Sequence, residues 1–520
     1  MKKRMKNKLN VTILLLCILF GTGSLFAQDE NPVPAKLSQK KMYADFDQLF
    51  SILQDCNPQL TIRKAVTGID QLQHIQSLRP AIDTITNIDN FYELLRTALN
   101  YTLDINTKES HTFNPQYDNL KKIDTVYMDY QRDNSMPLPL PKVLMGNPIC
   151  IKHDYFLPGI YQFINSAPGE KDTVELHYSK IISYNGIPFK SYVQDNLIKS
   201  PAAGTRWDYD NKEYYSLSAT IPLSGILIVE DKGKMMSLNL YHKYRVITNQ
   251  VDGYSVKPEI PWGNQYKNKV LYLEKDQILY IYFENMVDPQ NEIPQKIKEI
   301  GKGKEIKKVI IDVRGNRGGS DYVWHNTLKA IVAHTLVYNP ILAFKNTPLL
   351  KKTHQHSNAF FNIKKLNVEV FDWLPGESFL TTNFKPQFLE PDDNSLNYKG
   401  KIFILQDEKV YSAAHSLTSY ARHITQLVSV GEPCGFLAGF GLNPVLFQLK
   451  NSKFTFRMET TVDVSHVSEV IDVYQDFPEV RIHIPIHKKL EYIQDQGYDR
   501  QCETYLYKYD HLFQKVLELK

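Results

Sequence analysis

The pattern of apolar and polar positions divides the chain into three kinds of segment. From about residue 38 to 101, apolar residues recur at helical spacing, most clearly in YADFDQLFSILQDCNP and IDNFYELLRTALNYT. From about residue 117 to 249, short tyrosine-rich and β-branched runs are separated by turns, which predicts strands. From Val270 onward, strand patterns and helix patterns alternate. The pattern therefore predicts an α+β multidomain chain.

The alternating region predicts a mostly parallel sheet. ILYIYFENM, KKVIIDVRG and IFILQD have strand patterns, and EIPQKIKEIGKG and DYVWHNTLKAIVAHTL have helix patterns between or after them. Strands that alternate with helices are joined by right-handed crossovers. A later stretch, FQLKNSKFTFRMETTV, alternates as a hairpin.

Two segments of this region carry most of the candidate chemistry, at Lys307–Gly319 and Lys401–Leu417. Each begins with a strand pattern and breaks into a polar or glycine-rich turn. In the second segment the turn brings Ser412 to the start of a predicted helix, where backbone N–H groups favour negative charge. This position suits a nucleophile, and it equally suits a serine that only caps the helix.

The glycines of the first segment offer backbone that can approach a ligand closely, because glycine has no Cβ. If both segments lie in one parallel sheet, the N–H of Ala413 and that of Gly318 or Gly319 can form an oxyanion hole beside Ser412. Asp312 and Arg314 flank this loop, and we expect them to hold its shape.

The two segments resemble a known family. IIDVRGNRGG resembles the "hydrophobic-D-x-R-G-N-x-G-G" signature of the tail-specific, or C-terminal processing, serine peptidases, and YSAAHS resembles their "S-A-S/A-E" motif with Ser412 as nucleophile. The tricorn core protease and the interphotoreceptor retinoid-binding protein modules belong to this family. The resemblance implies a ClpP/crotonase-like α/β catalytic domain that hydrolyses peptide bonds without a metal or cofactor.

The resemblance also indicates the general base. The lysine that the processing proteases carry in a "T-F-G-K-G" loop is missing from GEPCGFLAGFG, and Lys450 and Lys453 fall in the next hairpin. The tricorn-like branch uses a histidine instead, and Ser110-His111-Thr112 resembles its "S/G-H-T/S" motif. This implies His111 as base, with a reference pKa of about 6.5. His415, three residues after Ser412, is an alternative.

The third catalytic group is placed by the same resemblance. IDVYQDFPEVRIHI resembles the end of the tricorn-like catalytic domain, where a glutamate precedes a "G-V-x-P-D-I" segment, and Asp472 falls at the glutamate position. The glycine of that segment is absent here. A carboxylate at this point would orient the base, as in a triad. The alternative is that Asp472 is only a surface residue. Asp476 is a second candidate for the catalytic carboxylate.

A further resemblance concerns the β-rich region. SKIISYNGIPFKSYVQDNLI reads as strand, Asn-Gly turn and helix, and it resembles the "I-x-x-I-N-G" core of PDZ-like modules. A generic hairpin and helix would give the same pattern. The expected organisation is then a signal peptide at 1–27, an N-terminal helical domain at 28–115, a PDZ-like region at 116–255 and the catalytic domain at 256–520.

The N-terminus reads as a secretory signal peptide. Five basic residues precede an apolar run and small residues, with cleavage expected after Ala27. Lipoprotein anchoring through Cys17 is the lesser alternative, because Leu16 is a poor neighbour for it and the apolar run continues. Cleavage lowers the formal net charge from +4 to −1, which removes the electrostatic case for nucleic acid or an anionic membrane. We expect a periplasmic or cell-envelope location and no membrane span after cleavage.

Four cysteines remain after cleavage, at Cys56, Cys150, Cys434 and Cys502. They are too far apart for CxxC metal sites, and in an oxidising compartment they allow one or two disulfides whose pairing stays open. Cys434 as a nucleophile lacks a nearby base. With no HExxH, phosphate-loop or dinucleotide motif either, we expect no metal or cofactor.

Two hypotheses follow from the sequence. The first is an exported serine endopeptidase that cleaves polypeptides by acyl transfer through Ser412. The second is a catalytically decayed member of the same family that binds a peptide or a small hydrophobic ligand. The sequence gives no signal for oligomeric state.

Overall fold

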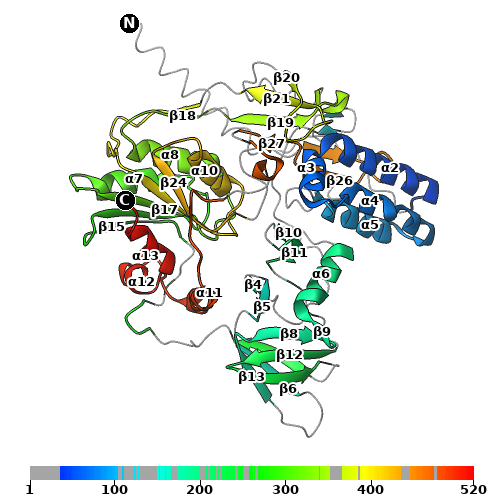
Figure 1. The fold of residues 1–520 in the computed structure, drawn as a ribbon, viewed down its shortest axis with the longest axis horizontal. Helices are drawn as coiled ribbons and strands as arrows, with labels where there is room; N and C mark the ends of the chain where they lie inside the picture. The colour runs from blue at the N-terminus through cyan, green and yellow to red at the C-terminus, as the bar shows by residue number, and fades with distance from the viewer. Residues whose placement is uncertain are drawn as a thin grey trace, which may run out of the picture.

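The structure is a computed structural model. It describes residues 36–102, 108–109, 122–123, 126–127, 149–151, 153–157, 160–165, 173–199, 205–208, 211–217, 219, 221, 225–240, 244–249, 257–261, 263, 267–338, 340–351, 366–383, 387–434, 445–465, 467–473 and 477–520. Figure 1 shows the catalytic sheet and its helices on one side, the N-terminal helices on the other, and the β-rich region below and between them.

The N-terminal region is helical, as the sequence predicts. Its segments are α2 (Gln39–Cys56), α3 (Pro58–Thr67), α4 (Gln71–Ser77), η1 (Arg79–Thr84) and α5 (Ile88–Asn100). Asn57 caps α3 by accepting the Leu60 N–H at 3.1 Å, and Pro58 occupies the first helical position, which separates α2 from α3.

A six-stranded sheet forms the centre of residues 256–520, which are called the catalytic region after their predicted role. Its order is β15 (Lys269–Leu273), β16 (Ile278–Tyr282), β17 (Lys308–Asp312), β23 (Ile402–Gln406), β24 (Leu427–Gly431) and β28 (Val480–Arg481). Only β15 is antiparallel to its neighbour. The mostly parallel sheet predicted from the sequence is therefore confirmed.

Helices cover both faces of this sheet. On one face lie α7 (Glu292–Gly301), α8 (Asp321–Ile331) and α10 (Ala413–Ala421), and near the other lie α11 (Ile486–Gln494), η4 (Asp495–Gly497), α12 (Glu503–Lys508) and α13 (His511–Leu517). Successive residues of a strand alternate between the two cores: Ile402 and Ile404 pack with the first group, Phe403 and Leu405 with the second. Burial on both faces explains why the strands are continuous apolar runs.

The described residues of the β-rich region form three small sheets. The largest has the order β13 (Lys234–Asn239), β12 (Ile226–Asp231), β8 (Lys180–Tyr184), β5 (Asp154–Phe156) and β4 (Ile149–Ile151), with β9 (Ile187–Pro188) paired to β8. The others are β14 (Tyr244–Asn249), β6 (Ile160–Asn165) and β7 (Thr173–His177), and β10 (Thr205–Asp208) with β11 (Glu213–Ser216). The Asn185-Gly186 turn leads through β9 into α6 (Phe189–Lys199), so the predicted strand, turn and helix are present.

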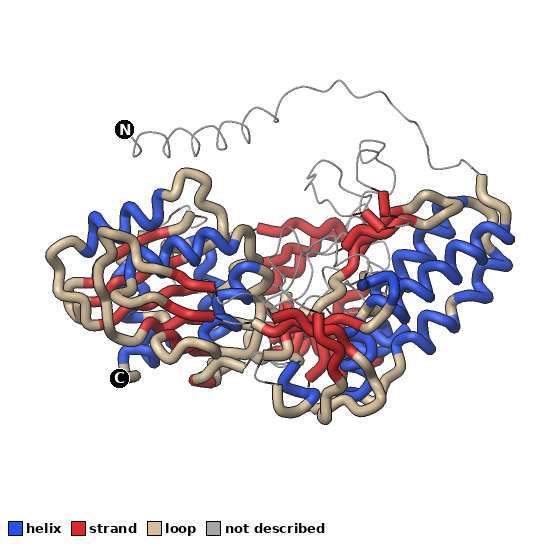
Figure 2. Tube along the Cα trace, turned by 90° about the horizontal axis from the view of Figure 1, so that it is seen from above, coloured by secondary structure: helices blue, strands red, loops and turns tan. Residues whose placement is uncertain are grey.

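The described residues form three further sheets. The first has the order β1 (Lys108–Glu109), β26 (Thr455–Met458), β25 (Val445–Gln448), β3 (Val126–Tyr127) and β2 (Lys122–Ile123). The second has the order β20 (Leu366–Glu369), β21 (Phe379–Asn383), β19 (Ile341–Lys345) and β27 (Val462–Asp463). The third pairs β18 (Leu336–Tyr338) with β22 (Gln387–Leu389). A short helix, η3 (Val470–Val473), follows β27. The N-terminal helices share one core with β19, β25 and β26, so they are packed onto the catalytic region rather than around a separate centre. Figure 2 shows strands between the helical end and the catalytic end.

Two sequence expectations differ from the structure. The predicted helix DYVWHNTLKAIVAHTL ends at Ile331, because Tyr398 pairs with the next residues: the Tyr398 N–H donates to the Ile331 carbonyl and the Tyr398 carbonyl accepts the Ala333 N–H. The four cysteines that remain after the predicted cleavage form no disulfide, although the sequence allows one or two. Among the described residues no helix is long and apolar enough to cross a membrane.

Candidate active site

Ser412 lies at a strained turn between β23 and α10. Its backbone has φ 52° and ψ −127°, a conformation that costs a residue other than glycine about 1–3 kcal/mol. Ser412 is the N-cap of α10, yet its side chain makes no capping hydrogen bond. The flanking residues Tyr411 and Ala413 are buried, whereas Ser412 is partly exposed. The helix-cap reading is therefore wrong, and the turn has the features of a nucleophile elbow.

The glycine loop after β17 packs directly against this turn. Gly315, Gly318 and Gly319 all have positive φ, at 77°, 98° and 146°. A Cβ added to Gly318 would lie 2.5 Å from Ser412 Cβ and 2.9 Å from Ala413 N. A Cβ on Gly319 would lie 2.2 Å from the Met286 carbonyl oxygen. Both positions therefore require glycine for close approach, as the sequence suggested.

Asn316 fastens this loop, and the sequence analysis did not single it out. Its buried side chain donates to the Phe283 carbonyl at 2.9 Å and accepts the Gly318 N–H at 2.8 Å. Its backbone carbonyl accepts the Tyr411 N–H at 3.0 Å. The Gly318 N–H is thus engaged, and the Gly319 N–H takes no part in these bonds. An asparagine enclosed by the loop glycines was the signal that could have drawn attention to it.

Asp407 provides a second tie between the loop and the Ser412 turn. One carboxylate oxygen accepts the Gly315 N–H at 3.0 Å and the Lys409 N–H at 3.0 Å. Because Lys409 is three residues before Ser412, the same carboxylate fixes both segments that meet at the candidate site.

A buried charge network lies behind the glycine loop. Arg314 donates to Asp312 at 2.6–3.2 Å and to Asp510 at 2.6 and 3.0 Å, and the Tyr280 hydroxyl donates to Asp312 at 2.7 Å. Asp510 also caps α13 by accepting the Phe513 N–H at 2.9 Å. Asp312 and Arg314 therefore join the loop to the C-terminal helices, in agreement with a supporting role.

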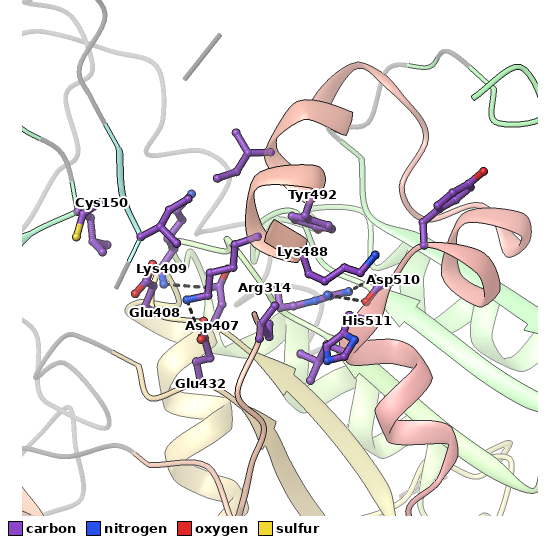
Figure 3. Close-up of a pocket in the computed structure, with 17 residues that line it drawn as sticks. Cys150, Arg314, Asp407, Glu408, Lys409, Glu432, Lys488, Tyr492, Asp510 and His511 are labelled. Carbon is purple, nitrogen blue, oxygen red and sulfur yellow. Dashed lines mark hydrogen bonds and ion pairs between the residues drawn. The ribbon is translucent and has the colours of Figure 1, made fainter. Parts of the chain in front are cut away.

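A cavity of about 100 Å³ opens at the same edge of the sheet (Figure 3). Its walls come from the β-rich region, the ends of three catalytic strands and the C-terminal helices: Cys150, Ile151, Leu217, Arg314, Asp407, Glu408, Lys409, Glu432, Ile484, Lys488, Lys489, Tyr492, Ile493, Tyr509, Asp510, His511 and Leu512. The β-rich region therefore meets the catalytic region at the turn that leads to Ser412.

One wall of this cavity holds a poorly exposed ion pair. The Nζ of Lys489, in α11, lies 2.7 Å from the Oε1 of Glu432, which follows β24. Burial and the neighbouring Glu408 raise the pKa of Glu432 to about 7, although Lys489 opposes the shift. The pKa of Lys489 is also raised, by Glu408, Glu432 and Asp407, against the effect of burial. A single lysine thus faces three carboxylates.

Part of the predicted catalytic set falls on residues outside those described. Ser110, His111 and Asp476 lie there. The strand that leads into Ser110 is described: β1 pairs antiparallel with β26, with Lys108 opposite Arg457 and Glu109 opposite Phe456.

Asp472 is described, and it lies in η3. Its Oδ2 accepts the Ser468 N–H at 2.9 Å, the Ser468 hydroxyl at 2.8 Å and the Glu469 N–H at 2.8 Å. These bonds and the nearby Arg422 lower the pKa of Asp472 although burial opposes the shift. Arg422 follows the C-terminal end of α10, about 15 Å along the helix axis from Ser412.

The alternative catalytic residues occupy other positions. His415 is buried within α10, one turn from Ser412. Cys434 is buried, with its sulfur 3.8 Å from the Thr418 hydroxyl. Lys450 and Lys453 lie in the turn after β25, where the Lys450 N–H donates to Gln48 of α2 at 2.9 Å. Figure 1 shows α2 and α10 on opposite sides of the molecule.

Among the described residues no group of three or more histidine, cysteine, aspartate or glutamate side chains is arranged to hold a metal ion. The chemistry that the described arrangement can support is nucleophilic: a strained serine, a helix N-terminus and a close-packed glycine loop.

Comparisons with known proteins agree with this geometry. Residues 277–467 match the family model described as Peptidase family S41. This range contains β17, the glycine loop, Ser412 and α10. No curated protein sequence matches the chain significantly.

Comparison with solved structures gives matches at low sequence identity. A serine-to-alanine mutant of CPAF has a TM-score of 0.54 at 13% identity, covering 90% of this chain and 98% of that chain. Mature CPAF has a TM-score of 0.53 at 12% identity, covering 92% and 98%. The photosystem II D1 C-terminal processing protease has a TM-score of 0.38 at 11% identity, covering 85% and 93%. The CPAF matches show that nearly the whole chain, beyond the catalytic sheet, shares one fold.

Proposed function

We propose that the chain is a serine-type peptidase of family S41, an exported endopeptidase that cleaves polypeptides through Ser412. The observation that carries the assignment of Ser412 is its backbone: φ is 52°, the side chain makes no capping bond, and Gly318 packs against its Cβ. A serine held in this conformation without a structural use for its hydroxyl is best explained by a reaction.

The proposed reaction is acyl transfer. The Ser412 hydroxyl attacks the peptide carbonyl while a general base accepts its proton, and the N–H groups of Ala413 and Gly319 stabilise the oxyanion. Gly318 supplies the close approach, since its N–H is bonded to Asn316. Expulsion of the amine leaves an acyl-enzyme, which water then hydrolyses.

We assign the general base to His111, with Ser110 beside it, on the strength of the sequence resemblance. Support from the described residues is indirect: β26 holds β1, which ends at Glu109. Asp472 remains the proposed carboxylate partner. Its three hydrogen bonds all reach Oδ2, so Oδ1 is left to orient an imidazole.

The β-rich region is proposed to act as a PDZ-like module that recruits substrate. It lines the cavity beside the Ser412 turn, and it carries Ile187 and Ile226 with exposed fractions of 44% and 42%. An extended polypeptide can bind such a module through main-chain bonds and apolar contacts. We expect Ile187→Ser combined with Ile226→Ser to raise KM for long substrates and to leave short fluorogenic peptides unaffected. Equal KM changes for both substrates would contradict recruitment.

Export is proposed from the basic and apolar N-terminus at residues 1–27. N-terminal sequencing of the protein recovered from the periplasm or medium should begin at Gln28. Recovery of the chain with Met1 intact in the cytoplasm would contradict export.

The test of the proposed activity uses two serines at helix N-caps. Ser38 is the N-cap of α2 and, like Ser412, makes no side-chain capping bond. We expect Ser412→Ala to abolish hydrolysis of an unstructured protein such as casein, with an unchanged urea unfolding curve, and Ser38→Ala to retain it. Hydrolysis by purified Ser412→Ala at the original rate would refute the nucleophile assignment.

A further inference from the structure

We propose that Val287 forms part of a specificity subsite beside Ser412, which accepts an apolar side chain of the polypeptide substrate next to the scissile bond. The inference rests on the proposed function and deepens it, because it names a class of substrate residue. Val287 lies in the segment that follows β16, and it is 54% exposed.

The segment that contains Val287 runs alongside the glycine loop. Met286 forms a parallel bridge with Gly319. The Met286 N–H donates to the Gly318 carbonyl at 3.0 Å, and the Met286 carbonyl accepts the Ser320 N–H at 2.8 Å. In such a bridge the N–H of the middle residue points away from the partner segment. The Gly319 N–H, which we propose as an oxyanion donor, therefore points to the opposite edge of the loop.

The register of this bridge places Val287 on the face of the loop that Ser412 occupies. One residue along from the bridge, Val287 lies beside Ser320, and Gly318 shares the face of Ser320 because extended residues alternate between faces. The bridging Met286 is buried and Val287 is exposed, as this alternation requires. A Cβ on Gly318 would lie 2.5 Å from Ser412 Cβ, so this face is turned toward the nucleophile.

Val287 is also close enough to meet a substrate side chain. Paired strands lie about 4.8 Å apart and rise about 3.3 Å per residue, so the Cα atoms of Val287 and Gly318 are separated by roughly 8 Å. A substrate whose carbonyl carbon reacts with Ser412 must place the side chains that flank this carbonyl within a similar distance. Gly319 and Ser320 are exposed and small, so they leave room for such a side chain.

Asn268 holds the same segment on its other edge. It directly precedes β15, and its carboxamide donates to the Val287 carbonyl at 3.1 Å and accepts the Asn285 N–H at 3.3 Å. The backbone around Val287 is thus fixed from both sides. A single exposed valine ordinarily needs no explanation, so the register and this fixed backbone carry the proposal, rather than exposure alone.

The test maps the bonds that the protein cuts in casein, by mass spectrometry of the products. We expect the unmodified protein to favour apolar residues at one position beside the cut bond. Val287→Lys should shift that position toward Asp and Glu, and Val287→Glu should shift it toward Lys and Arg. On matched short peptides each shift should change the ratio of kcat/KM values about tenfold. A purely structural role of Val287 predicts no opposite response to opposite charges.

Val337 supplies the matched control. It is 48% exposed and lies in β18, which follows the far end of α8 and is therefore remote from the glycine loop, where α8 begins. Val337→Lys and Val337→Glu should keep the cleavage profile of the unmodified protein. If Val287→Lys does not fold, as judged by urea denaturation, Val287→Thr keeps the shape of the side chain and should weaken the apolar preference.

Several results would overturn the subsite. They are an unchanged profile in both charged variants of Val287, or the same shifts in the variants of Val337. A changed oligomeric state in size-exclusion chromatography, with an unchanged profile, would assign Val287 to a contact with a second copy of the chain. Failure of the unmodified protein to react with a fluorophosphonate and to cut casein would instead overturn the proposed function, and this inference with it.

Discussion

The proposed site joins two regions that are supported very differently. Ser412 and the glycine loop follow buried parallel strands, and Asn316, Asp407 and Arg314 tie them together and to the C-terminal helices. By contrast, the proposed base follows β1, a two-residue strand at the edge of a sheet, and Asp472 belongs to a 3₁₀ turn. The comparison indicates that the proposed nucleophile and oxyanion donors are fixed in advance, whereas the proposed base depends on peripheral segments.

Removal of the base should have the largest effect. We expect His111→Ala to lower kcat by roughly two to four orders of magnitude, because the serine proton then has no acceptor. Lys450→Ala and Lys453→Ala should change kcat less than twofold, since their hairpin turn is held against α2. Steady-state kinetics on a short peptide decides the matter. Comparable losses in a lysine variant would shift the base away from His111.

In the region around the glycine loop, a substitution in the buried charge network should lower the stability of the fold. Arg314→Leu would leave Asp312 and Asp510 buried without their partner, which typically costs about 3–5 kcal/mol of unfolding free energy. Arg79→Leu is the matched control, because Arg79 also pairs bidentately, with Asp47, but at the surface. Loss of this surface ion pair should cost less than about 1 kcal/mol of unfolding free energy. Urea denaturation measures both, and equal costs would show that the buried network does not hold the loop.

How much of the fold and of the candidate site could be predicted from the sequence depends on how far apart in the chain the interacting residues lie. The apolar runs that give β17 and β23, and the turns after them, are local features, so the positions of Ser412 and the glycine loop could be predicted. The partner of Arg314 could not, because Asp510 is 196 residues away and begins a C-terminal helix that carries no recognisable motif. The place of Asp472 near Arg422 depends on tertiary packing in the same way.

The close approach at Gly318 should be sensitive to a single methyl group. Gly318→Ala would place a Cβ against Ser412 and the Ala413 N–H, and a displacement of this size costs about a hundredfold in rate. Gly376 also has positive φ, at 87°, but among the described residues no atom beyond its chain neighbours lies within 4 Å of its Cβ position. Gly376→Ala therefore isolates backbone strain. If both variants keep full activity, the loop does not contribute to the reaction.

The ion pair in the cavity wall predicts a pH dependence of stability. Because the folded-state pKa of Glu432 is raised to about 7, its contribution is present below its unfolded pKa and is lost as pH rises through about 7. Between pH 5 and 8 the loss should approach about 2–3 kcal/mol of unfolding free energy. Glu432→Gln should flatten this part of the profile. An unchanged slope in the variant would show that another group titrates.

The most direct test of the central claim is to identify the residue that reacts. The native protein is treated with a fluorophosphonate, digested, and the adduct is located by tandem mass spectrometry. Preorganised support for the nucleophile predicts one adduct, on Ser412, which Ser412→Ala loses and Ser38→Ala keeps. An adduct on another serine, or none on a folded protein that still hydrolyses casein, would contradict Ser412 as the nucleophile.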